Sequence, residues 1–251
     1  MKWHDFCLIL VMRESRKNIL AETGLFHKIW RGHNREHVLA CRYDKLRYLK
    51  SLFDTHTDEI KPQVRLYGYC VMFNHVHEVG QVVADENNDH TEAIKSFGDW
   101  MRNAHSRYGM YYNRKYDRQG KVAYDRPKTS EIQNIEEHLQ RVMFYCDANP
   151  VRAGIVKHPS NYEYSSYKFY AFGKRDEYTE HLEMPTWYLK LGKTAKERQK
   201  KYRQLCDEYL RKAGYIDNIP EQMECRFIGD GAWQKTRKLL MKKTKRMRDG
   251  P

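Results

Sequence analysis

Apolar residues recur at helical spacing in three parts of the chain, and each part predicts a helix. In residues 35–54 the stripe consists of Leu39, Leu46, Leu49 and Phe53. In residues 91–113 it consists of Ile94, Phe97, Met101, Ala104, Tyr108 and Tyr111. In residues 131–148 it consists of Ile135, Leu139, Val142 and Cys146. Pro150 should stop this third helix, because proline disfavours helical geometry at the residue before it.

Shorter apolar runs predict strands instead. Residues 63–72, QVRLYGYCVM, and residues 75–83, HVHEVGQVV, read as two strands joined by a tight turn at Phe73 and Asn74. A further strand is expected in GLFHKIWRG, residues 24–32. Together these segments predict a chain that contains both strands and helices.

The pattern of residues changes after about residue 175, where charged segments follow. Thr194 and Glu197 have the spacing of a capping box, which predicts that a charged helix begins there. Residues 235–248, KTRKLLMKKTKRMR, carry eight Lys or Arg. This basic run is either a solvated helix face or a contact for a polyanion. We therefore expect two parts, a domain over residues 1–175 and a helical, basic C-terminal extension over residues 176–251.

Composition narrows the class of protein. The 251 residues hold 46 Lys and Arg against 33 Asp and Glu, a net charge of +13, which favours a polyanionic partner such as nucleic acid. The sequence contains no run of about 18 apolar residues, so we expect no membrane span. The six cysteines include no CxxC pair, so we expect reduced core thiols in a cytoplasmic protein.

His75 and His77 are the first candidates for chemistry. In a strand, residues two apart point to the same face, so the two imidazoles should lie side by side. Such a pair can bind a metal and leave coordination positions open for a substrate. The alternative is two hydrogen-bonded histidines on a sheet, which is the usual outcome for an isolated His-x-His.

The helix over residues 131–148 offers partners for that pair. Tyr145 and Asn149 are four residues apart, hence on neighbouring turns of one helix edge. An amide oxygen such as that of Asn149 can bind a hard metal ion, and a tyrosine hydroxyl can attack phosphorus. The alternative for Tyr145 is a packed aromatic ring, since the chain has 19 tyrosines.

Three ordered motifs resemble one family. MFNHVHEV, SRYGMYYNRKYDRQGK and FYCDANPVRAGIVKHPSNYEYSSY are similar to segments of the REP-associated tyrosine transposases, within the HUH single-strand nuclease superfamily. The resemblance covers about residues 20–175. It implies an α+β fold with a ferredoxin-like antiparallel sheet and packed helices. It further implies Mg²⁺ or Mn²⁺ and a single-stranded DNA substrate that often contains a hairpin. It also implies cleavage that leaves a 5′-phosphotyrosine and a free 3′-hydroxyl, and the reverse reaction, which joins strands.

Carried over by position, the resemblance gives each candidate a role. His75 and His77 match the metal-binding histidines, Tyr145 matches the nucleophile, and Asn149 stands where related enzymes have a polar metal ligand. Glu78 follows the histidines where an apolar residue is common, and strand geometry turns it away from them. GKVAYDRPKT, residues 120–129, departs from the family pattern and leaves substrate recognition open. The expected DNA contacts are Arg114, Lys115, Arg118, Lys121 and Arg152.

The sequence thus favours a metal-dependent single-strand DNA endonuclease and strand transferase, active as a monomer or a homodimer. Two alternatives stay open. One is a catalytically silent nucleic-acid-binding module on the same scaffold. The other is a metal-dependent hydrolase that uses water on another phosphodiester.

Overall fold

The computed structural model describes residues 15–123, 126–212 and 225–249. Its centre is a five-stranded sheet in the order β2-β3-β1-β4-β5. The strands are β1 (Leu25–Arg31), β2 (Val64–Val71), β3 (His75–Val82), β4 (Lys128–Ile132) and β5 (Phe227–Ile228). The first four pair antiparallel, while β5 lies parallel to β4.

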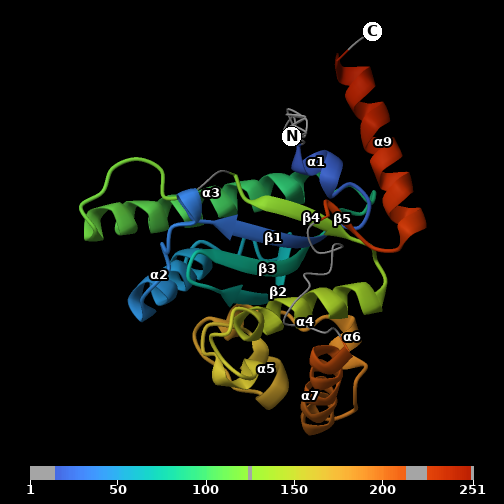
Figure 1. The fold of residues 1–251 in the computed structure, drawn as a ribbon. Coiled ribbons are helices and arrows are strands. Elements are labelled where there is room, and N and C mark those ends of the chain that lie inside the picture. The colour runs from blue at the N-terminus through green and yellow to red at the C-terminus, as the bar shows by residue number, and fades with distance from the viewer. Residues whose placement is uncertain (1–14, 124–125, 213–224, 250–251) are drawn as a thin grey trace, which may run out of the picture.

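Helices cover both faces of this sheet (Figure 1). In chain order β1, α2, β2, β3, α3 and β4 follow the ferredoxin-like arrangement, which confirms the predicted α+β fold. The two crossover helices, α2 (Arg42–Phe53) and α3 (Thr91–Lys115), contact each other on one side of the sheet. The helix α4 (Glu136–Arg152) lies across the other side, against β2 and β3.

The remaining elements are short or lie outside the sheet. They are α1 (Arg16–Ile19), η1 (His33–Arg35), η2 (Pro159–Asn161), α5 (Tyr167–Phe172), η3 (Thr179–His181), α6 (Thr186–Leu189), α7 (Ala195–Lys212) and α9 (Gly231–Asp249). The capping box before α7 is confirmed, since Glu197 N–H donates to Thr194 Oγ1 and Thr194 N–H donates to the Glu197 carboxylate. The helix α9 extends away from the body of the molecule (Figure 1).

Two predicted helices have wrong boundaries. The first begins at Arg42 rather than near residue 35, because η1 and a turn precede it. Residues 131 and 132 belong to β4, where Glu131 pairs with β1 and Ile132 with β5, so the third helix begins at Glu136. Ile135 lies just before it, 39% exposed, and is not part of its buried stripe.

The third helix also continues through Pro150, contrary to the prediction. Proline removes one hydrogen bond from a helix, but here it does not end it. The helix ends at Arg152, and Gly154, two residues later, turns the chain away with a φ of +67°. Gly154 N–H donates to the carbonyl of Val151 and Ile155 N–H to that of Pro150, the bonds of a Schellman motif.

The cysteine prediction holds in part. Cys70, Cys146 and Cys206 are buried thiols, whereas Cys41 and Cys225 are half-buried, and Cys7 lies outside the described residues. Within the described residues, no helix combines the length and the apolar character that crossing a membrane requires.

Candidate active site on the α4 face of the sheet

Alternation along β3 sorts its polar residues onto two faces. His75 and His77 lie on the face that α4 covers, with ring centroids 4.9 Å apart. Glu78 lies on the opposite face, paired across the strands with Lys28 of β1. The expected geometry of the histidine pair and the expected direction of Glu78 are both observed.

The helix α4 brings Tyr145 to these histidines. The centroid of the Tyr145 ring is 5.6 Å from that of His77, with an angle of 85° between the planes. Only 5% of Tyr145 is exposed. The structure therefore brings Tyr145 to His77, which lies beside His75, although the tyrosine is far from both histidines in the sequence.

Two polar residues of α4 lie near the tyrosine. The Asn149 amide donates to the backbone carbonyl of Tyr145 at 2.9 Å, and Asn149 is 8% exposed. The Arg152 guanidinium lies 5.1 Å from the centroid of the Tyr145 ring. Asn149 thus lies one turn beyond the tyrosine, as predicted, and its role as a metal ligand stays a prediction.

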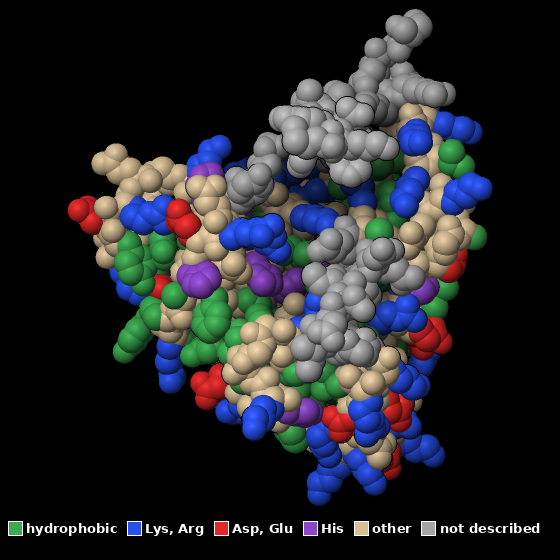
Figure 2. All heavy atoms as spheres, in the orientation of Figure 1, with side chains coloured by type: hydrophobic (Ala, Val, Ile, Leu, Met, Phe, Trp, Pro, Cys, Tyr) green, Lys and Arg blue, Asp and Glu red, His purple; other side chains and the backbone are tan. Residues whose placement is uncertain are grey.

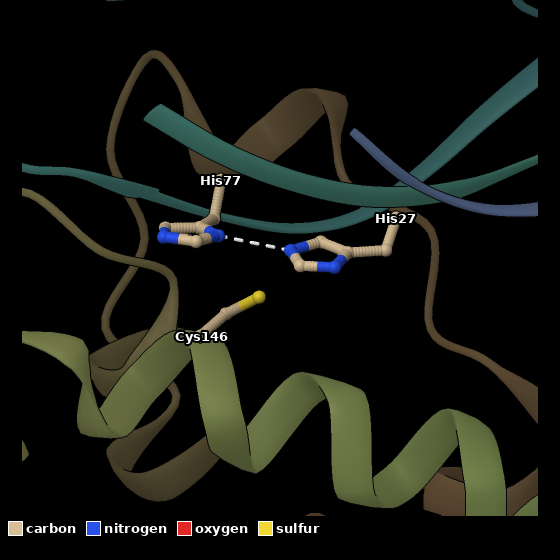
Figure 3. A group of neighbouring side chains, drawn as sticks. All are labelled: His27, His77 and Cys146. Atoms are coloured by element: carbon tan, nitrogen blue, oxygen red, sulfur yellow. Dashed lines mark hydrogen bonds between the residues drawn. The ribbon is translucent and has the colours of Figure 1, made fainter. Parts of the chain in front are cut away.

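His27 and Cys146 complete the cluster. The sequence placed Cys146 in the apolar stripe of its helix and gave neither residue a role in chemistry. The Nε2 atom of His27 is 2.9 Å from Nδ1 of His77, and the Cys146 thiol from α4 faces this pair (Figure 3). The alternation of GLFHKIWRG puts His27 on one face of β1. Only the register with β3, in which Ile29 lies opposite His77, shows that this face is the histidine face.

Burial keeps the three imidazoles neutral. It lowers the pKa of His27 to about 3 and the pKa of His75 to about 4, each with smaller contributions from neighbouring positive groups. Burial, and then His75 and His27, lower the pKa of His77 well below its usual value. Neutral imidazole is the form that binds metal ions.

One ring nitrogen of each histidine on β3 is a candidate donor to a cation. Nδ1 of His75 is 2.6 Å from the side-chain oxygen of Asn74, which leaves Nε2 for a ligand. Nε2 of His77 is buried and has no hydrogen-bond partner among the described residues. This nitrogen carries a lone pair only when the His77 proton is on Nδ1, donated to His27.

The predicted DNA contacts are spread more widely. Lys115 is paired with Asp44 at 2.7 Å and Arg118 with Glu36 at 2.7 Å, while Arg114 and Lys121 are exposed. The segment 121–123 reaches the sheet end that holds His75, since Gly32 forms a bridge with Ala123 and bonds the carbonyl of Asn74. Lys and Arg side chains also line α9 (Figure 2). Binding of DNA by these groups stays a prediction.

Comparison with known proteins gives little beyond this geometry. No family model matches the chain, and no curated protein matches it. One solved structure, of a REP-associated tyrosine transposase bound to a REP hairpin, is similar with a TM-score of 0.45 and 17% identity. That similarity covers 65% of this chain and 93% of the other.

Proposed function

We propose that this protein is a metal-dependent single-strand DNA endonuclease and strand transferase with Tyr145 as its nucleophile. The observation that carries the proposal is the position of Tyr145, whose ring meets His77 edge-on at 5.6 Å. The three ordered sequence motifs support it independently of the geometry. The chain has one His-x-His pair, and a tyrosine that served only for packing would have no reason to lie beside it.

The reaction proposed for Tyr145 is a transesterification. Its phenolic oxygen forms a bond to the phosphorus of a DNA phosphodiester as the bond from phosphorus to the 3′-oxygen breaks. The phenol gives up its proton to solvent, and the departing 3′-oxygen takes one from water. The products are a 5′-phosphotyrosine and a free 3′-hydroxyl, so attack by a 3′-hydroxyl in reverse would join two strands.

His75, His77 and Asn149 are the proposed cation ligands. A divalent ion bound there would polarise the phosphate and orient it for attack. Imidazole nitrogen suits Mn²⁺ better than Mg²⁺, which prefers oxygen ligands. His27 would hold the His77 ring by accepting a hydrogen bond from Nδ1. Arg152, beside the tyrosine ring, would stabilise negative charge on the phenolic oxygen.

The proposed substrate is single-stranded DNA, in keeping with the resemblance and the net charge of +13. Arg114, Lys115, Arg118, Lys121 and Arg152 are the proposed phosphate contacts. Lys115 and Arg118 would exchange an acidic partner for a phosphate, whereas the exposed Arg114 and Lys121 would not.

The test is cleavage of 5′- and 3′-labelled hairpin oligonucleotides taken from the DNA that flanks this gene. With Mn²⁺, wild-type protein should form a covalent protein–DNA adduct that resists denaturation, and Tyr145→Phe should lose it by at least ~10³-fold. Tyr43→Phe is the matched control, because Tyr43 is 75% exposed and outside the site.

Two other functions predict different results. A hydrolase that uses water would still cleave DNA after Tyr145→Phe, without an adduct. A silent binding module would bind the oligonucleotides and cleave none of them with either metal. Either result would contradict the tyrosine mechanism.

A further inference from the structure

A second set of metal donors lies behind His77, on the side away from its Nε2 atom. One donor atom from each of His27, His77 and Cys146 lies within 4.8 Å of the other two. The sulfur of Cys146 projects from α4 toward the hydrogen bond between the two histidines (Figure 3). All three side chains are buried, with exposed fractions of 1%, 2% and 3%.

We propose that these three residues form a binding site for a thiophilic d¹⁰ cation, Cu⁺ or Zn²⁺. The ligands would be Nε2 of His27, Nδ1 of His77 and Sγ of Cys146. Thiolate sulfur with two imidazole nitrogens selects such ions over Mg²⁺ or Mn²⁺. In tetrahedral zinc sites the corresponding donors are about 3.3–3.6 Å apart, as the Zn–N and Zn–S bond lengths require. The two nitrogens, 2.9 Å apart in their hydrogen bond, would therefore separate by about 0.4 Å, and the sulfur, within 4.8 Å of both, would approach them by up to about 1 Å.

Charge distinguishes the two ions. Cu⁺ with one thiolate and two neutral imidazoles leaves no net charge in the buried site, whereas Zn²⁺ leaves one positive charge. An uncompensated buried charge is costly. The site is therefore expected to prefer Cu⁺, and three ligands also satisfy the low coordination number of that ion.

Metal binding at this site requires two proton movements, one at Cys146 and one at His77. The Cys146 thiol releases its proton to solvent and becomes a thiolate. His27 keeps one proton, on Nδ1, and frees Nε2. His77 loses the proton from Nδ1 and, as a neutral imidazole, carries it on Nε2 instead.

The last movement links the two sites. A proton on Nε2 of His77 removes the lone pair that the proposed nuclease cation needs. A thiophilic ion should therefore exclude Mn²⁺ from His75 and His77, and so inhibit the nuclease. This exclusion rests on the proposed function, whereas the thiophilic site itself does not.

The first test measures the thiophilic site alone. Full-length protein is titrated with Zn²⁺, and separately with Cu⁺ without oxygen, against a coloured chelator of each ion. Wild type should bind one equivalent, roughly 100-fold more tightly than Cys146→Ser. Cys206→Ser is the matched control, since Cys206 is a buried thiol elsewhere and should leave the affinity unchanged.

Equal affinities in wild type and Cys146→Ser would overturn the inference. If the serine variant does not fold, Cys146→Ala and His27→Gln give the same comparison. Because the donors are buried, titrations are followed until the signal is constant.

The second test measures exclusion through the paramagnetic signal of free Mn²⁺. Wild type with one equivalent of the thiophilic ion should lose Mn²⁺ binding, and Cys146→Ser should keep it. Simultaneous binding of both ions would overturn the exclusion. If metal-free wild type binds no Mn²⁺, the proposed nuclease site fails, while the chelator titration still decides the thiophilic site.

Discussion

At the scale of single residues, two adjacent residues of β1 lie on opposite faces of the sheet and have different surroundings. His27 faces the histidine cluster, whereas Lys28 faces α2 and α3 and is fully buried. Lys28 forms an ion pair with Glu78, to which Tyr48 also donates a hydrogen bond at 2.9 Å. This pair accounts for Glu78, which stands where the resembling family commonly has an apolar residue. Burial lowers the pKa of Lys28 to about 8, against the opposing effect of Glu78.

Lys28→Met should therefore destabilise the protein by about 3–5 kcal/mol, because it leaves the Glu78 carboxylate buried without its cation. The double variant Lys28→Met/Glu78→Met should recover most of that loss. Unfolding in denaturant measures the free energy of unfolding of the single and the double variant. Lys50→Met, which breaks an exposed pair with Asp54, serves as the control and should cost less than ~0.5 kcal/mol. An equal loss in the single and double variants would mean that packing, rather than charge, holds this site.

At the scale of elements, the position of Tyr145 depends on how α4 is bounded. The helix starts after β4 and ends at Arg152, two residues before the left-handed Gly154, and Pro150 lies within it. Asn149 and Arg152 therefore both belong to the helix and stay in helical register with Tyr145. A helix that stopped at Asn149 would leave Arg152 in a loop.

Gly154→Ala should lower the free energy of unfolding by about 1 kcal/mol, because a positive φ is strained for alanine but not for glycine. Nothing lies within 4 Å of the added Cβ, so a steric clash does not contribute. Gly98→Ala is the opposite case, since Gly98 lies inside α3 and its added Cβ would meet only Arg16 at 3.5 Å. It should stabilise by ~0.5–1 kcal/mol. Destabilisation by both variants would contradict this account.

The local pattern of apolar residues predicted most of the helices and strands but not all of their boundaries. The alternation around His75 and His77 and the four-residue spacing of Tyr145 and Asn149 match the positions of these residues in the structure, and their roles stay predictions. Residues 131–132 were misassigned because strand pairing with β1 and β5 is a long-range effect. His27 was missed for the same reason, since its neighbours depend on the register between β1 and β3.

At the scale of the whole molecule, several elements after residue 175 pack on the rest of the chain. The helix α7 packs on α4 and α5, where Tyr202 donates to the buried Asp147. The strand β5 joins the sheet, and Arg237 of α9 pairs with Glu131 of β4 at 2.8 Å. A two-residue strand leaves no signal in the sequence. The boundary at residue 175 stays a prediction.

Cations on α9 and α7 allow a test of where DNA binds. Replacing Lys238, Lys242 and Lys243 of α9 with alanine should weaken DNA binding and reduce the slope of log affinity against log salt by about 2, if all three contact phosphates. The matched control replaces Lys196, Lys200 and Lys201 of α7, which are also exposed and change the net charge equally. On α7, acidic side chains lie among the basic ones (Figure 2). Equal losses in the two triple variants would indicate that only net charge matters.

The central claim is a covalent bond between Tyr145 and DNA, and the most direct measurement locates that bond. The protein–DNA adduct formed with Mn²⁺ is digested with nuclease and trypsin, and the peptides are sequenced by mass spectrometry. Tyr145 is the one tyrosine of the tryptic peptide 142–152. The account predicts a 5′-linked nucleotide on Tyr145 of that peptide. A nucleotide on another residue, or cleaved DNA with an unmodified peptide 142–152, would contradict it.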